Sequence, residues 1–128
     1  SRFHAIGRDG QAVAKNLASR LEEAGLRWAA TGLPAAWMWS RFADFRLTTL
    51  YVSAPLLHPE ELGLRPVEQG ENVWVVQPRD EGVFHAVTRV ESMPCVHPVQ
   101  VYLDLLGHPE RSKEAAAKLR SDLLAWRT

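Results

Sequence analysis

The sequence predicts an α+β fold, in which a small mixed sheet packs against helices in the order α-β-α-β-β-β-α-α. Apolar residues recur at helical spacing near both ends of the chain. The middle instead contains short runs rich in β-branched and aromatic residues, bounded by proline and glycine. With 128 residues, 46% of them hydrophobic and 23% charged, the chain is expected to form one folded domain over residues 1–128.

The first helix is expected between Asp9 and Gly25. Asp9 is a favourable N-cap, and Gly25 is a typical stop just past a helix end. The apolar residues between them share one helical face: Val13, Leu17, Leu21 and Ala24. The next apolar run, residues 26–30, ends at Thr31-Gly32 and predicts a short strand.

A second helix is expected to begin near Pro34 and to run to about residue 42, because proline is favourable in a first helical turn. Residues 45–53 form a β-rich run that ends before Pro55 and predicts a strand. Prolines and glycines interrupt residues 54–71, which predicts an irregular segment.

The strongest strand signal covers residues 72–77. A turn is expected at residues 78–82, followed by a further strand over residues 83–90. Residues 98–106 predict a helix that is apolar almost all round and is therefore expected to be buried. Its one polar strip is formed by Gln100 and Asp104, which are expected either to be solvated or to hydrogen bond a neighbouring element.

The sequence offers no set of catalytic or metal-ligating residues, so we expect no enzyme activity, no cofactor and no metal. No two acidic residues are separated by one position, although two-metal phosphoryl or nucleotidyl transfer commonly uses such a pair on a strand face. A glycine-rich phosphate loop ending in Gly-Lys-Ser/Thr is missing from the sequence, and the five histidines form no i,i+4 pair. Cys95 is expected to be a buried small apolar residue rather than a nucleophile.

Composition also limits the partners. Fifteen basic and fifteen acidic residues cancel, which excludes a domain that is basic over its whole surface and binds nucleic acid by charge alone. No apolar run reaches the roughly 18–20 residues that a membrane-spanning helix needs. We therefore expect no membrane partner. Because the chain has one cysteine and no internal disulfide framework, we expect a cytoplasmic protein.

The last helix, expected from Ser112 to about Trp126, carries a basic ridge. Its apolar stripe is formed by Ala115, Ala116, Leu119, Leu123 and Trp126. Lys113, Arg120 and Arg127, spaced seven apart, line one flank of this stripe. One interpretation of the ridge is a contact surface for an acidic partner or for a nucleic-acid backbone. The alternative is that the alkyl stems of these side chains cover the border of the apolar stripe while their charges stay in water.

Two tryptophans of the second helix, Trp37 and Trp39, point to different sides of it. One is expected in the core, whereas the other is a candidate anchor for a partner, because tryptophan is favoured at interface centres. Ordinary core packing of both side chains is the alternative.

Five segments resemble the C-terminal domain of AbiEi-family antitoxins over about residues 10–125. They are residues 30–37 (ATGLPAAW), 45–52 (FRLTTLYV), 72–76 (NVWVV), 97–105 (HPVQVYLDL) and 114–120 (EAAAKLR). Members of this family are transcriptional regulators in type IV toxin–antitoxin systems. The resemblance therefore implies a non-enzymatic antitoxin or regulatory domain that counteracts a nucleotidyltransferase-like toxin, its cognate partner.

The resemblance also implies an N-terminal winged-helix domain that binds the promoter in full-length relatives. That domain is expected to be absent from this chain, so DNA would be contacted only indirectly or through the missing domain. Two alternatives remain open. One is a stand-alone interaction module of a regulator that forms a homodimer through Trp37, Trp39 or Leu124. The other is an enzyme that resembles a nucleotidyltransferase in element order alone.

Overall fold

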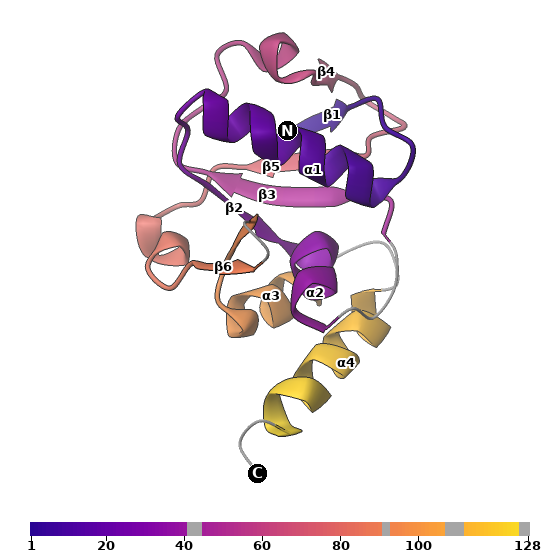
Figure 1. Ribbon diagram of the computed structural model, residues 1–128, viewed down its shortest axis with the longest axis vertical. Coiled ribbons are helices and arrows are strands. Elements are labelled where there is room, and N and C mark those ends of the chain that lie inside the picture. Colours follow the sequence, from indigo (N-terminus) through magenta and orange to yellow (C-terminus); the bar gives the residue numbers. More distant parts are fainter. Residues whose placement is uncertain (41–44, 91–92, 107–111, 126–128) are drawn as a thin grey trace.

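The computed structural model describes residues 1–40, 45–90, 93–106 and 112–125, and the statements below concern these residues (Figure 1). Its helices are α1 (Gly10–Glu23), α2 (Gly32–Ser40), α3 (Pro98–Leu105) and α4 (Ser112–Ala125). The strands are β1 (Arg2–His4), β2 (Trp28–Thr31), β3 (Thr48–Val52), β4 (Arg65–Pro66), β5 (Val73–Val76), β6 (Thr88–Val90) and β7 (Met93–Cys95). Two short 3-10 helices, Pro59–Leu62 and Glu81–Phe84, lie in the connections.

The strands form one mixed sheet in the order β4-β1-β5-β3-β2-β7-β6. β3 lies at its centre, antiparallel to β2 and parallel to β5. β2 in turn pairs in parallel with β7, whereas the outer pairs β1–β4, β1–β5 and β6–β7 are antiparallel. The predicted α+β class with a mixed sheet is confirmed.

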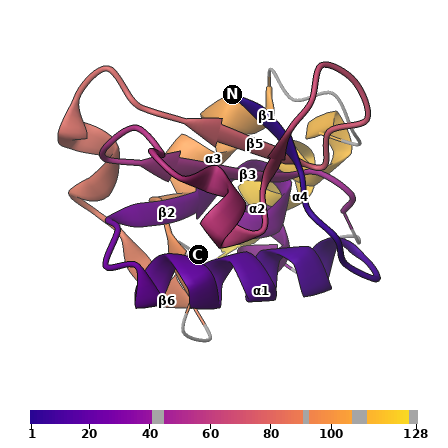
Figure 2. The same ribbon diagram turned by 90° about the horizontal axis from the view of Figure 1, so that it is seen from above.

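The helices divide between the two faces and one end of the sheet. α1 lies across one face, and α3 lies on the opposite side of β2 and β3 (Figure 2). α2, α3 and α4 pack against one another at one end of the sheet (Figure 1). This cluster of three helices brings the C-terminal part of the chain onto β2 and β3.

The central strands show the alternation that a sheet with two different faces requires. Leu50 and Val52 of β3 belong to the buried core, as do Val73 and Val75 of β5. Tyr51, which lies between Leu50 and Val52, points to the other face and is half-buried. The face that carries Tyr51 is therefore less completely covered than the core face.

The first helix follows its prediction closely. The Asp9 side chain accepts a hydrogen bond from the backbone N–H of Ala12 at 2.8 Å, which satisfies one of the free donors at the helix N-terminus. The side chains expected on its apolar face are buried apart from Ala24, which is the C-cap residue and is exposed. Gly25 follows with φ +70°, the left-handed conformation that glycine adopts most easily.

The prediction of a strand over residues 83–90 is wrong for the first half of this range. The Asp80 side chain accepts a hydrogen bond from the N–H of Gly82 at 2.7 Å and starts the 3-10 helix Glu81–Phe84. Only Thr88–Val90 is extended, and it pairs with β7. The two-residue or three-residue strands β1, β4 and β7 were also missed, because so few residues show no periodicity.

Candidate functional site

The carboxylate of Asp104 connects α3 to two strands of the sheet. The hydroxyl of Thr31, the last residue of β2, donates to Asp104 Oδ2 at 2.5 Å, and the hydroxyl of Tyr51 on β3 donates to the same oxygen at 2.9 Å. Gln100, one helical turn before Asp104, donates through Nε2 to Oδ1 at 2.9 Å. Of the two expectations for the polar strip of α3, hydrogen bonding to neighbouring elements is thus confirmed.

The register of the sheet places these strand residues together. β2 and β3 pair Thr31 with Thr49, and β3 and β5 pair Thr49 with Trp74, so the three residues form a row across the sheet. Tyr51, two residues further along β3, lies on the same face and pairs with Val76. The half-covered face of the sheet therefore presents hydroxyl and aromatic groups to α3.

A small cavity of about 160 Å³ opens between this face and α3. We call it the Asp104 notch. Its lining consists of Thr31, Gly32, Thr49, Tyr51, Trp74, Val76 and Asp104. Four separate chain segments meet there, so the notch depends on the complete fold.

In the notch, the carboxylate of Asp104 accepts its hydrogen bonds from neutral groups. Two hydroxyls and one amide donate to Asp104, and no basic residue in the described ranges forms an ion pair with it. Burial, together with the hydrogen bond to Asp104 and its negative charge, raises the pKa of Tyr51 far above its usual value. Tyr51 therefore stays protonated and keeps donating to Asp104 throughout the physiological pH range.

The predicted basic ridge lies on α4. Ala115, Ala116 and Leu119 of the expected apolar stripe are buried, and Arg120 beside them is exposed. The side chains of Lys113 and Arg127, and those of Leu123 and Trp126, lie outside the described residues.

Lys118 differs from Arg120 in that it forms an i,i+4 ion pair with Asp122 at 2.8 Å. Among the described residues Arg120 has no hydrogen-bond or ion-pair partner, so its charge is available on the surface of α4.

Of the two tryptophans of α2, only Trp37 has a side chain within the described residues. Trp37 is half-buried and packs against the core, which is the ordinary structural use of this side chain. The side chain of Trp39 lies outside the described residues. Trp37 does not belong to the described lining of the Asp104 notch.

The expectation that the helix at residues 98–106 is buried all round is wrong for one of its sides. Val101 and Leu105 are completely buried on the face that packs against α2 and α4. Val99, Leu103 and Leu106 are spaced so that they share the other face, and they are 50%, 54% and 54% exposed. We call this set the α3 stripe. It is exposed because the described neighbours of α3 cover only one side of the helix.

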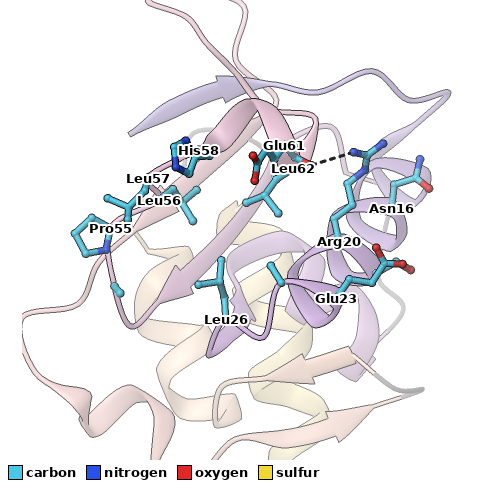
Figure 3. Close-up of a pocket in the computed structure, with 13 residues that line it drawn as sticks. Asn16, Arg20, Glu23, Leu26, Pro55, Leu56, Leu57, His58, Glu61 and Leu62 are labelled. Carbon is cyan, nitrogen blue, oxygen red and sulfur yellow. Dashed lines mark hydrogen bonds between the residues drawn. The ribbon is translucent and has the colours of Figure 1, made fainter.

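A larger groove of about 840 Å³ separates α1 from the segment after β3 (Figure 3). Arg20 reaches across it from α1, and its Nη1 donates to the backbone carbonyl of Glu61 at 3.3 Å. Acidic side chains (Glu23, Glu61) and Arg20 share the lining with leucines, so the groove does not favour ions of one sign. The sequence analysis missed this groove, because residues 54–71 show no regular pattern.

Comparison with known proteins identifies a family. A family described as "Transcriptional regulator, AbiEi antitoxin, Type IV TA system" matches residues 7–125, which is nearly the whole chain. The chain belongs to the AbiEi antitoxin family. No curated protein and no solved structure matches it.

In this AbiEi-family chain, the segments that carry the resemblance converge on the Asp104 notch. The segments 30–37, 45–52, 72–76 and 97–105 supply every residue of its lining. The sequence analysis identified Gln100 and Asp104 as a polar strip but did not connect them with Thr31 or Tyr51. Those contacts join residues 53 and 73 positions apart, which periodicity does not reveal.

Two further observations concern the described part of this antitoxin-family chain. Among the described residues, no cluster of three or more His, Cys, Asp or Glu side chains is suited to hold a metal ion. Of the helices in the described ranges, none is both long enough and apolar enough to cross a bilayer.

Cys95 on β7 is completely buried, as expected for a small apolar residue. Burial raises the pKa of its thiol from 9.0 to about 12. The thiolate, which is the reactive form, is therefore scarce in the folded antitoxin-family chain at neutral pH.

Labelling with a thiol reagent at pH 8 is expected to be at least about 100-fold slower in the folded state than in guanidinium chloride, because only the unfolded chain exposes an ordinary thiol. The unfolded thiol ionises near pH 9 and the folded one near pH 12, so the unfolded state releases its proton first. The free energy of unfolding should thus fall as the pH rises between these values. Equal labelling rates in the two states would contradict the burial of Cys95.

Proposed function

We propose that this chain is a non-enzymatic antitoxin domain that counteracts a nucleotidyltransferase-like toxin in the cytoplasm. The observation that carries the proposal is the match of the AbiEi antitoxin family to residues 7–125. The sequence supports the non-enzymatic part, because it lacks an acidic pair separated by one position, which two-metal nucleotidyl transfer commonly uses. Promoter binding belongs, in this proposal, to an N-terminal winged-helix domain that is joined to the domain in full-length relatives.

The proposed working surface is the basic flank of α4. Arg120 is exposed beside the buried residues Ala116 and Leu119, so its charge can meet a partner without disturbing the core. The seven-residue spacing in the sequence predicts the same flank for Lys113 and Arg127. In this proposal the three cations favour an acidic surface on the partner, since complementary charge speeds the encounter and fixes its orientation.

The test is growth rescue by a double charge-reversal variant, Lys113→Glu with Arg120→Glu. When the variant is co-expressed with the toxin encoded beside the gene of this chain, rescue is expected to be lost. Each substitution replaces an attraction by a repulsion and leaves the core unchanged. Circular dichroism and thermal unfolding of the purified variant check that the fold is intact.

A matched control carries the same change in net charge elsewhere. Lys15 on α1 and Arg79 after β5 are both exposed and lie outside α4. Lys15→Glu with Arg79→Glu is expected to rescue growth as the wild type does. Full rescue by the α4 variant would overturn the assignment of this surface, and loss of rescue in both variants would show an effect of net charge alone.

A further inference from the structure

The Asp104 notch has a property that the α4 surface does not explain, namely a half-buried carboxylate without a positive partner among the described residues. We propose that the notch binds a basic side chain of a partner protein, a guanidinium or ammonium group on an alkyl stem. This inference stands apart from the antitoxin function, because binding in the notch can be measured on the isolated chain.

The size of the notch fits a single side chain. Pockets for drug-sized ligands and cofactors usually enclose about 300–1,000 Å³. The notch encloses about 160 Å³. It is therefore too small for a nucleotide and suited to one group at the end of a chain.

The charge of the notch selects a cation. An ionised carboxylate has about four positions that accept hydrogen bonds. Thr31 and Tyr51 use two on Oδ2, and Gln100 uses one on Oδ1, so one position on Oδ1 remains for an incoming donor. The three donors present are neutral and leave the negative charge uncompensated, whereas a guanidinium or ammonium group would neutralise it and form a charge-assisted hydrogen bond.

The walls of the notch suit the rest of such a side chain. Tyr51 and Trp74 are aromatic, and a cation is attracted to the face of an aromatic ring. Val76 at the end of β5 is 38% exposed and gives an apolar edge for an alkyl stem. Because the hydroxyls of Thr31 and Tyr51 already hold the carboxylate in place, little ordering is needed when the cation enters.

The surroundings favour a protein as the source of the cation. The α3 stripe lies beside the polar strip of α3, since Leu103 and Gln100 are neighbours on the helix surface at i,i+3 spacing. A free small cation would leave this stripe exposed to water. A partner that covers the stripe with apolar residues would bring its own basic side chain to Asp104.

The test uses the ¹⁵N-labelled chain and three probes: agmatine, N-acetyl-arginine amide and its neutral isostere N-acetyl-citrulline amide. We expect saturable NMR shifts of the Trp74 indole N–H and of the amides of Tyr51 and Asp104 with the two cationic probes, and not with the citrulline probe. Equal responses to the arginine and citrulline probes, or no saturable response to the cations, would overturn the proposal.

The variant Asp104→Asn keeps the shape of the side chain and removes its charge. It is expected to weaken binding of the arginine probe by at least about tenfold, as the loss of a charged hydrogen bond usually does. Asp122→Asn on α4, which removes the acid paired with Lys118, is the matched control and should leave binding unchanged. Should Asp104→Asn fail to fold, the rise in melting temperature of the wild type with the arginine probe, and not with the citrulline probe, serves as the second measurement.

The source of the cation is decided by a fourth probe, acetyl-Leu-Arg-Leu amide, whose leucines can cover the α3 stripe. Binding at least about tenfold tighter than that of agmatine supports a protein partner. Binding of agmatine as tight as that of the tripeptide would overturn the protein source and indicate a free small cation. Leu103→Ser, which removes the apolar contact without adding a charge, should reduce tripeptide binding and leave agmatine binding unchanged.

Discussion

The variant Leu105→Ala is expected to lower the free energy of unfolding by about 2–5 kcal/mol, which is the usual cost of removing a buried leucine side chain beyond Cβ. Leu105 is 0% exposed and lies on the face of α3 that packs against α2 and α4. Alanine would leave a cavity where three helices meet, and the rigid packing there would close it only in part. Since a domain of this size is stable by about 5–15 kcal/mol, the loss is a large share of the total.

Leu103→Ala is the matched control for this prediction, because it makes the same change two residues away on the same helix. Leu103 is exposed and belongs to the α3 stripe, so its truncation should change the free energy of unfolding by less than about 0.5 kcal/mol. Urea unfolding monitored by tryptophan fluorescence measures both variants. Similar costs for the two substitutions would contradict the orientation of α3.

The second large effect is expected for Gly10→Ala, with a loss of about 3 kcal/mol, the upper end of what overpacking usually costs. Gly10 is the first residue of α1, and a Cβ atom there would lie 1.8 Å from the backbone oxygen of Phe45. Backbone atoms cannot swing aside as a long side chain can, so the helix or the segment at Phe45 would have to shift. Helix propensity alone predicts the opposite sign, since alanine is favoured over glycine by about 1 kcal/mol.

Gly25→Ala separates this steric effect from backbone strain. Gly25 has φ +70°, but no atom lies within 4 Å of the position that a Cβ would take. Its replacement should therefore cost only about 1 kcal/mol, the strain of a left-handed alanine. A Gly10→Ala variant as stable as the wild type would show that Phe45 does not pack against the start of α1.

The parts of the fold that the sequence predicts are those with local signals. The cap at Asp9 and the apolar spacing from Val13 to Leu21 identify α1, and the β-branched runs identify β3 and β5. The pairing of β3 with β5 in parallel, and of β2 with β7, joins segments far apart in the chain. Such pairings depend on the packing of the whole domain, so periodicity within one segment cannot predict them.

In the candidate site, too, the features with a local signal in the sequence were predicted and the long-range contacts were not. A polar pair at i,i+4 spacing on an apolar helix was visible in the sequence as Gln100 and Asp104, and a partner for Asp104 was one of the two expectations. The identity of that partner depends on the register of β2 and β3, which places Thr31 and Tyr51 on the face toward α3. The exposed α3 stripe was missed for a related reason: an apolar helix surface does not reveal which of its sides has a neighbour in the fold.

We propose antitoxin activity for the domain that residues 7–125 form within this chain. Growth rescue is the most direct measurement of this claim: the chain is co-expressed with the toxin encoded beside its gene, and its solubility and folding are confirmed in the same cells. Restored growth, with no DNA-binding domain supplied, is the predicted result. Continued growth arrest in the presence of soluble, folded chain would contradict the claim that this domain alone counteracts the toxin.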